Sequence, residues 1–309
     1  MAVIKIDNLT KDYGNRRGCF DVSFEIEQGE VFGFLGPNGA GKTTTIRHLL
    51  GFLKPDSGVS YIDGKASWKN AHKINANVGY LPGEINFPEK MTGMELIKWM
   101  AEMRGTKSLD KAKYLLNLFE LNPNSDVKRM SKGMKQKIGI VGAFMHDSNI
   151  LILDEPTSGL DPLMQELFVG LVAKEKAEGK TVLMSSHMFQ EVEKTCDRVA
   201  IIKNGEIVTQ VNMDDIHRAK SKIYKLKFAV EGESVMIAKE HPELDFTELN
   251  HDKNRVKVRV DDNDINSFVA LLASYRLRYV SEMKLTLEDY FMRYYSNKND
   301  GKGDAKYAI

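Results

Sequence analysis

A glycine-rich run near the N-terminus has the residue types and spacing that bind phosphate. The run Gly36-Pro37-Asn38-Gly39-Ala40-Gly41-Lys42-Thr43-Thr44 fits the pattern G-x-x-x-x-G-K-[ST]. Its glycines let successive backbone N–H groups point into one concavity, an anion nest at a helix N-terminus. Lys42 adds a positive charge for the terminal phosphates, and Thr43 offers a hydroxyl to Mg²⁺. The run therefore indicates a nucleotide site rather than a glycine-rich turn that ends in a solvated lysine.

The segments on either side of this run support that interpretation. Residues 31–35 are short and apolar, as a buried strand should be, and residues 44–50 have a helical pattern. A strand that feeds a glycine-rich turn, which in turn opens a helix, is the structural context that this motif requires.

Two adjacent carboxylates follow a second apolar run. Residues 150–153 read as a strand buried on both faces of a parallel sheet, and Asp154 and Glu155 come directly after it. Open α/β sheets place their ligand groups at the carboxyl ends of the strands. One carboxylate can therefore serve a metal and the other a water. The run 156–161 that follows weakens the alternative, a turn with two solvated acids.

Two further residues are candidates for nucleotide contacts. His187 follows another expected strand, 181–186, on the face where the phosphates should be, although a lone histidine is usually structural. Tyr13 lies in a turn-like segment and could stack on an adenine ring, because aromatic–base stacking is worth ~1–3 kcal/mol per base. On this residue alone, an ordinary loop tyrosine is the favoured interpretation.

Length and composition limit the class of protein. A chain of 309 residues suggests about two domains, and 42% hydrophobic with 28% charged residues is ordinary for a globular protein. The formal net charge of +1 gives no global basic field, so no nucleic acid partner is expected. Two cysteines, Cys19 and Cys196, favour a reducing cytosol over a disulfide framework. There is no signal peptide and no apolar run near the ~20 residues of a membrane span, so another chain would have to cross any membrane involved.

The rest of the chain divides near residue 220. Residues 3–9 alternate like an edge strand with a hairpin partner at 20–27, residues 92–121 are helical, and residues 198–210 predict a hairpin around Asn204-Gly205. Beyond residue 220 the predicted order is βαββαβ, which suggests a small ferredoxin-like domain. The strands are expected at 223–230, 246–249, 255–260 and 279–285, and the helices at 234–240 and 265–274. Residues 287–295 are expected to form a final amphipathic helix, and the tail 297–309 to be disordered.

With these residues assembled, the chain resembles the ATP-binding subunit of an ABC transporter over about residues 1–218. The ordered set of motifs carries the resemblance. Residues 36–44 match the Walker A motif and residues 150–155 match the Walker B motif. The signature motif is matched by Ser131-Lys132-Gly133-Met134-Lys135-Gln136, and the D-loop by residues 158–161. His187 resembles the switch histidine, and Tyr13 resembles the adenine-stacking aromatic residue. Lys132 stands where the commonest family pattern has glycine.

The resemblance implies an α/β fold class. Residues 1–218 would form a P-loop NTPase cassette with a parallel core sheet, an antiparallel edge subdomain and a helical subdomain at about 86–146. A small α+β ferredoxin-like domain at 219–296 and the tail at 297–309 would follow.

The resemblance also implies the chemistry, ATP hydrolysis with ATP and Mg²⁺ as cofactors. Lys42, Glu155 and His187 would be catalytic, with Glu155 polarising the attacking water, and Thr43 and Asp154 would hold Mg²⁺. Two cassettes, either two copies of this chain or this chain and a homologue, would sandwich the nucleotide. The partner cassette would then contribute Ser131, Lys132, Gly133 and Asp161 to the ATP held by residues 36–44 and Tyr13.

One loop departs from the family pattern. After Tyr80-Leu81-Pro82 the family usually has a glutamine that senses Mg²⁺ and the γ-phosphate, whereas this chain has Gly83 and then Glu84. Either Glu84 substitutes as a metal ligand, or the metal contact is mediated by water.

Several runs narrow the resemblance to one branch of the family. Residues 81–84, 134–137 and 161–165 look like the bacitracin- and lantibiotic-type exporters, which are ABC-2-like and pair with separate membrane subunits. This implies a cytoplasmic ATPase, peripheral on the inner face of the cell membrane, that powers a separate permease exporting antibiotic peptides or drugs. The alternatives are a soluble ABC ATPase of translation or DNA maintenance, disfavoured by the single motif set, and a non-transporting regulatory subunit, disfavoured by the intact Glu155 and His187.

The segment 84–88 is a candidate for coupling to that permease. It leaves the nucleotide site and enters the helical segment, and Phe87, Met91, Trp99 and Met103 could form an apolar patch for a membrane subunit. The alternative is that Phe87 fills the local core.

Overall fold

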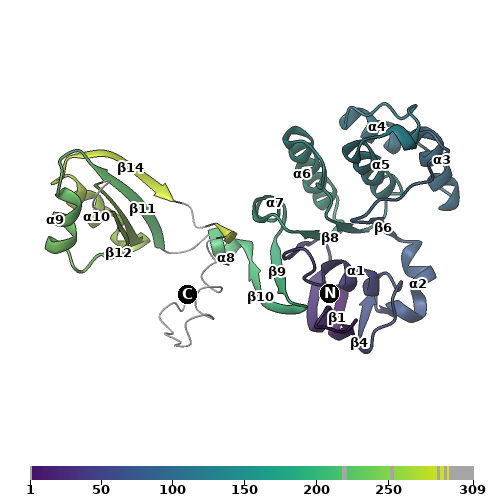
Figure 1. Ribbon diagram of the computed structural model, residues 1–309, viewed down its shortest axis with the longest axis horizontal. Helices are drawn as coiled ribbons and strands as arrows, with labels where there is room; N and C mark the ends of the chain where they lie inside the picture. The colour runs from purple at the N-terminus through teal and green to yellow at the C-terminus, as the bar shows by residue number, and fades with distance from the viewer. Residues whose placement is uncertain (1, 218–220, 251–253, 284–285, 289–290, 292–309) are drawn as a thin grey trace. The chain divides into compact units, whose positions relative to one another are not determined.

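The computed structural model describes residues 2–217, 221–250, 254–283, 286–288 and 291. The chain divides into two compact units, Met1–Met213 and Asp214–Ile309, which run from purple to green and from green to yellow in Figure 1. The tail expected at 297–309 and most of the helix expected at 287–295 lie outside the described residues.

A six-stranded sheet forms the centre of the larger unit. Its order is β10-β9-β3-β8-β7-β6, and all neighbours are parallel except β10 against β9. The strands are β3 (Val31–Leu35), β6 (Val78–Leu81), β7 (Ile150–Asp154), β8 (Thr181–Ser186), β9 (Arg198–Lys203) and β10 (Glu206–Asn212). Strands β3, β7 and β8 are buried throughout, which explains why their sequences are apolar runs without alternation. The hairpin predicted around Asn204-Gly205 is confirmed, and both turn residues have positive φ, as a two-residue hairpin turn requires.

Helices cover both faces of this sheet. Helix α1 (Lys42–Leu49) packs between it and a second, antiparallel sheet. Helices α5 (Lys132–Phe144), α6 (Pro162–Ala177) and α7 (Phe189–Thr195) contact β6, β8 and β3 from the opposite side. Close approach of α5 needs small residues, because a Cβ on Gly79 of β6 would lie 2.3 Å from the Ala143 carbonyl oxygen.

The stretch predicted to be helical over 92–121 contains two helices. Helix α3 (Gly93–Met103) begins with a capping box, in which Thr92 and Glu95 satisfy each other's backbone N–H groups. A turn with Gly105 at φ 66° follows α3, and α4 (Asp110–Leu118) begins five residues later. With α5 and a 3-10 turn, η1 (Val127–Arg129), they form the helical part at one end of the larger unit (Figure 1).

The antiparallel sheet corrects one prediction. Its order is β2-β1-β4-β5, formed by β1 (Ala2–Asp12), β2 (Gly18–Glu27), β4 (Ser57–Ile62) and β5 (Lys65–Ala66), with α2 (Ser67–Asn75) beside it. The prediction of an edge strand over 3–9 is wrong, because β1 pairs with both β2 and β4. Alternation of apolar and polar residues indicates that one face of a strand is buried, but it does not indicate how many neighbouring strands the strand pairs with.

The smaller unit has the predicted βαββαβ order. It contains β11 (Ser221–Phe228), α9 (Glu233–Glu240), β12 (Asp245–Asn250), β13 (Arg255–Asp261), η2 (Asp262–Asp264), α10 (Ile265–Leu272) and β14 (Leu277–Met283), after a short helix α8 (Met213–His217). The strands form one antiparallel sheet in the order β12-β13-β11-β14, which is the ferredoxin-like arrangement. Helices α9 and α10 cover one face of the sheet (Figure 1), and the core between them includes Phe228, Ile237, Val258 and Phe268.

Candidate nucleotide-binding and active site

The glycine-rich run connects the end of β3 to the start of α1, as its sequence predicts. Gly39 and Gly41 have φ values of 79° and 107°, which only glycine adopts readily. At Gly41 space is also limiting, since a Cβ there would lie 2.5 Å from the Gly18 carbonyl oxygen. The Gly36 N–H donates to the Ser186 carbonyl (3.1 Å), so the loop is anchored to the end of β8.

Lys42 is held inside this loop and is only 5% exposed. Its ammonium donates to the carbonyl oxygens of Gly36 (2.6 Å) and Pro37 (3.2 Å). It also lies 3.0 Å from Oε1 of Glu155, which follows β7. The positive charge of the loop and the acid after the neighbouring strand are therefore in direct contact.

The two adjacent carboxylates have different surroundings. Asp154 is fully buried; its Oδ2 accepts from the Thr43 hydroxyl at 2.7 Å, and its Oδ1 accepts from the Ser185 hydroxyl. Glu155 has a positive φ of 50°, and its N–H donates to the Ser185 hydroxyl at 3.0 Å. Its Oε2 lies 2.5 Å from Nδ1 of His187. The Glu155 carboxylate thus sits between Lys42 and His187, while Asp154 faces Thr43.

The Thr43–Asp154 pair fits a magnesium ion. Mg²⁺ takes oxygen ligands and is usually bound through one or two carboxylates with substrate phosphates and waters. The hydroxyl of Thr43 and the buried carboxylate of Asp154 supply two such oxygens beside the glycine-rich loop.

At the unusual loop after β6, Gly83 approaches Asp154 closely. A Cβ on Gly83 would lie 3.1 Å from Oδ2 of Asp154. The side chain of Glu84 is exposed. Burial, with a smaller effect of Asp154, raises the pKa of the nearby Tyr80 hydroxyl to about 12. The backbone at Gly83 is thus the part of this loop that lies against the Asp154 carboxylate.

Two residues of the predicted in-trans set begin helices. The Ser131 hydroxyl accepts from the N–H of Met134 (3.2 Å) at the start of α5. The Asp161 carboxylate does the same for the N–H of Met164 (3.0 Å) at the start of α6. Side-chain oxygens at these positions satisfy N–H groups that have no partner within the helix.

The other two residues of that set contact the D-loop of the same chain. Lys132 donates to the Ser158 hydroxyl at 2.9 Å. Gly133 packs so closely that a Cβ there would lie 2.6 Å from the Gly159 carbonyl oxygen. Lys132, which replaces the glycine of the commonest pattern, therefore links the signature segment to the residues that follow β7.

Tyr13 lies in the turn between β1 and β2 and is 53% exposed. Its N–H donates to the Arg17 carbonyl at 2.8 Å, and the strand after this turn begins at Gly18, whose carbonyl lies against Gly41. The end of the hairpin therefore adjoins the glycine-rich loop, with an accessible aromatic ring.

Sequence reasoning assigned no role to three residues that hold this site together. Ser185 pairs with Asp154 in the β7–β8 register. Its hydroxyl donates to the Asp154 carboxylate and accepts from the backbone N–H of Glu155. Gln136 is 2% exposed and donates to the carbonyls of Glu155 (3.2 Å) and Pro156 (2.7 Å). Glu191 accepts from the Ser186 hydroxyl, and burial raises its pKa. The sequence could have indicated Ser185, because it lies at the carboxyl end of a predicted strand. The roles of Gln136 and Glu191 depend on tertiary contacts that the sequence does not show.

The comparisons with known proteins agree with this geometry. The family model described as ABC transporter matches residues 19–158. The chain is 33% identical over 254 residues to the bacitracin transport ATP-binding protein BcrA of Bacillus licheniformis, covering 81% of this chain and 83% of that protein. It is 32% identical over 297 residues to an uncharacterized ABC transporter ATP-binding protein, YhcH, of Bacillus subtilis, covering 94% and 95%. A solved ATP-binding subunit of an ABC transporter superposes with a TM-score of 0.63 at 32% identity, over 70% of this chain and 92% of that one.

The parallel sheet, the glycine-rich loop and the paired acids define a P-loop ATPase of the ABC cassette class. The chain belongs to the ATP-binding proteins of ABC transporters. It is the subunit of a transporter that binds ATP and hydrolyses it to ADP and phosphate. The expected fold class, family and ATPase activity are therefore confirmed. None of the helices in the described part of the chain has the length and hydrophobicity needed to cross a membrane.

Proposed function

We propose that two cassettes, each of about residues 1–218, dimerise around two ATP molecules and drive a separate permease in the cell membrane, at its cytoplasmic face. One observation supports the chemistry above all: the Glu155 carboxylate contacts both Lys42 and His187 next to the Thr43–Asp154 pair. In this arrangement Glu155 can accept a proton from water while Lys42 and His187 face the phosphates. Hydrolysis then depends mainly on positioning and electrostatics.

The residues have separate tasks in this proposal. The loop N–H groups and Lys42 bind the phosphates, and Tyr13 stacks on the base. Thr43 and Asp154 hold Mg²⁺, which neutralises phosphate charge when it is bound. Support for dimerisation comes from a bacterial ABC transporter cassette solved as a dimer, with a TM-score of 0.62 at 25% identity over 68% of this chain and 98% of that one.

In the dimer, each cassette would complete the site of the other. Ser131, Lys132, Gly133 and Asp161 would meet the ATP held by the partner. In this structure, Lys132 and Gly133 contact the D-loop of their own chain. Because of these contacts, the signature segment and the D-loop would move together when the dimer forms.

We infer export as the direction of transport, with antibiotic peptides or drugs as cargo. The support is the similarity to the bacitracin transport protein and to Nod factor export ATP-binding protein I of Ralstonia nicotianae, at 32% identity over 67% of this chain and 66% of that one. Co-purification with a multi-span membrane protein encoded beside this chain tests the permease partner, and drug resistance conferred by the pair tests the cargo.

The variant Glu155→Gln tests the active site. We expect turnover to fall by about 10²–10⁴, the usual contribution of a general base, because the amide cannot accept the proton. ATP binding should remain, and the variant should accumulate an ATP-bound dimer in size-exclusion chromatography with light scattering. Glu206→Gln, an exposed site on β10, is the matched control and should behave as the wild type. Wild-type turnover in Glu155→Gln would remove Glu155 from this role.

A further inference from the structure

The two faces of the smaller unit's sheet differ sharply in character. Alternate residues of β11 and β13, such as Leu226, Val256 and Val258, are buried against α9 and α10. The residues between them project from the opposite face, and most of them are cationic. That face carries Lys225, Lys227, Arg255, Lys257 and Arg259, all of them partly exposed.

The register places cations directly opposite one another. Lys225 pairs with Lys257, and Lys227 pairs with Arg255, across β11 and β13. Like charges directly opposite in an antiparallel pair are destabilising. A sheet face that only meets water gains nothing from two such pairs in succession, so the arrangement points to an anion that offsets them.

The acids on this face compensate only part of the charge. Glu248 lies 2.6 Å from Lys257, and Asp245 lies 3.2 Å from Arg259, both from the neighbouring strand β12. Within the described ranges, no carboxylate pairs with Lys225, Lys227 or Arg255. Nε of Arg255 is also shielded from solvent without a hydrogen-bond partner among the described groups. A shielded donor of this kind costs free energy unless an acceptor reaches it.

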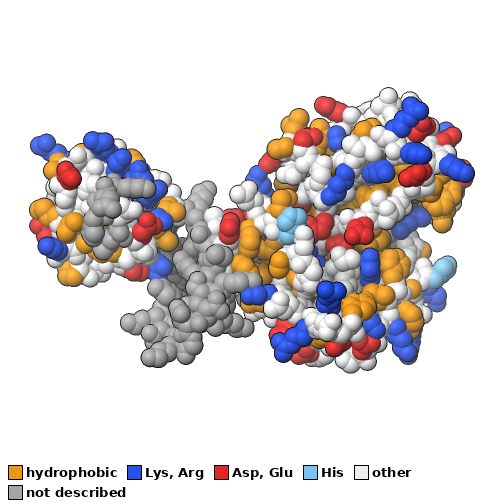
Figure 2. Space-filling view, viewed as in Figure 1, with side chains coloured by type: hydrophobic (Ala, Val, Ile, Leu, Met, Phe, Trp, Pro, Cys, Tyr) orange, Lys and Arg blue, Asp and Glu red, His pale blue; other side chains and the backbone are white. Residues whose placement is uncertain are grey.

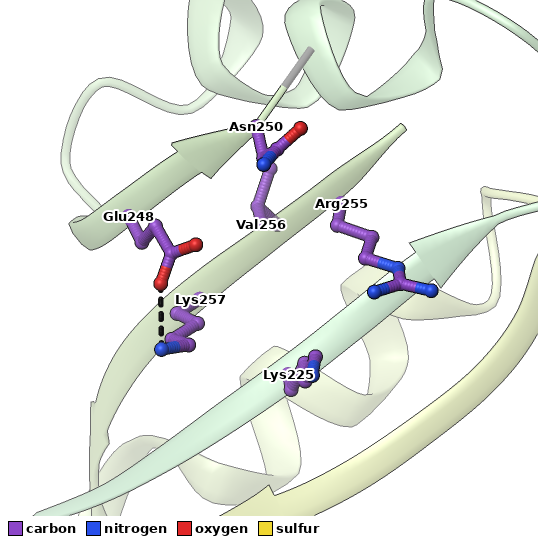
Figure 3. A pocket seen from close by; sticks show the side chains of 6 residues that line it. All are labelled: Lys225, Glu248, Asn250, Arg255, Val256 and Lys257. Atoms are coloured by element: carbon purple, nitrogen blue, oxygen red, sulfur yellow. Dashed lines mark ion pairs between the residues drawn. The ribbon is translucent and has the colours of Figure 1, made fainter. Parts of the chain in front are cut away.

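A small cavity lies between these side chains. It has a volume of about 120 Å³ and is lined by Lys225, Glu248, Asn250, Arg255, Val256 and Lys257. Figure 3 shows the Arg255 guanidinium extending from β13 over β11, on the same side of the sheet as Lys225, with Glu248 and Lys257 paired at the other end. Since a water occupies roughly 30 Å³ of liquid, the cavity suits a group of a few heavy atoms.

We propose that this cavity binds a phosphate group, with Arg255 as its fork-shaped donor and Lys225 as its second charge. Guanidinium matches the geometry of phosphate oxygens, and an ammonium adds a point charge. Lys227, directly opposite Arg255, adds to the attraction. The Glu248 carboxylate at the far wall repels anions and confines the phosphate to the Arg255 end. The phosphate belongs either to a soluble phosphate compound or to the headgroup of an anionic lipid.

The test compares two charge-matched double variants of the full chain. Lys225→Gln with Arg255→Gln removes the proposed donors. Lys222→Gln with Lys239→Gln removes the same charge elsewhere, because Lys222 is opposite Val260 on the helix-covered side and Lys239 is in the last turn of α9. All binding is measured with Mg²⁺ and just enough of a non-hydrolysable ATP analogue to saturate the nucleotide site, so that its three phosphates fill the glycine-rich loop of the larger unit and leave no room there for the probe.

Equilibrium dialysis with labelled inorganic phosphate is the first arm, and co-sedimentation with phosphatidylcholine vesicles containing phosphatidic acid is the second. We expect the cavity variant to lose about tenfold or more in affinity for at least one probe, because it loses two charge-assisted contacts. The control should stay within about twofold. Binding of inorganic phosphate indicates a soluble compound, and binding of vesicles alone indicates a lipid headgroup.

The thermal melting temperature of each variant shows whether a loss of binding comes from unfolding. The cavity variant should fold and melt at or above the wild-type temperature, since it removes cross-strand repulsion. The proposal is overturned if neither probe binds the wild type, or if the cavity variant binds both probes as tightly as the control variant does.

Discussion

The contact between Gly83 and Asp154 leads to a prediction about the unusual loop after β6. In Gly83→Ala the new Cβ would lie 3.1 Å from Oδ2 of Asp154, whereas ordinary van der Waals contact begins near 3.4 Å. Asp154 is fully buried and is fixed on its other side by Ser185, so the loop or the carboxylate must shift by about 0.3 Å. A misplacement of 1 Å at a reacting centre can cost about a hundredfold, so a shift of this size should lower Mg-dependent hydrolysis by about three- to tenfold.

The assay is steady-state release of phosphate from MgATP, with magnesium titrated at fixed ATP. Gly170→Ala in α6 is the matched control, because nothing lies within 4 Å of the Cβ position there. It should keep full activity and gain slightly in stability, since alanine is a better helix former than glycine. Glu84→Ala should be nearly silent, because the Glu84 side chain is exposed. Normal hydrolysis in Gly83→Ala together with a large loss in Glu84→Ala would refute this reasoning and make Glu84 the sensor.

Two other predictions concern stability and coupling. Burial, reinforced by Arg104, lowers the pKa of His146 to about 4, so below pH 6.5 the unfolded chain takes up a proton that the folded chain does not. Unfolding in urea should therefore show about 1–2 kcal/mol less stability at pH 5 than at pH 7, and His146→Gln should remove most of this difference. Phe87 is half-buried, and as a coupling residue its replacement by alanine should weaken association with the permease while sparing isolated ATPase activity. A loss of about 3–5 kcal/mol in stability with unchanged association would instead place Phe87 in the core.

The sequence predicts the catalytic face because parallel strands end together. Buried parallel strands have recognisable apolar sequences, and the groups that follow each strand meet at one edge of the sheet. Lys42, Asp154 and His187 are far apart in the chain, yet Asp154 ends a strand of this kind and the other two come after one. Their assembly follows from topology, so no side-chain packing had to be known in advance.

Residues that act through tertiary contacts are harder to predict. Gln136 lies within the recognised signature, but its two bonds to the carbonyls after β7 depend on how α5 docks against the sheet. The position of β1 inside its sheet was mispredicted for a similar reason, since alternation is the same for a strand with one neighbour or two. In both cases the missing information is which elements are adjacent in space.

In the smaller unit, too, the sequence does not show which strands are adjacent, and here that adjacency affects the inferred function. The alternation of Arg255, Lys257 and Arg259 with valines identifies a strand with one charged face, and a solvated face is the ordinary explanation for such charges. The register adds that Lys225 and Lys227 stand opposite two of these cations. A lysine on a lone strand can turn toward water, whereas cations that face each other on neighbouring strands repel each other. The case for an anion site therefore rests on the pairing of two strands about thirty residues apart in the chain, and the sequence of either strand alone does not reveal that pairing.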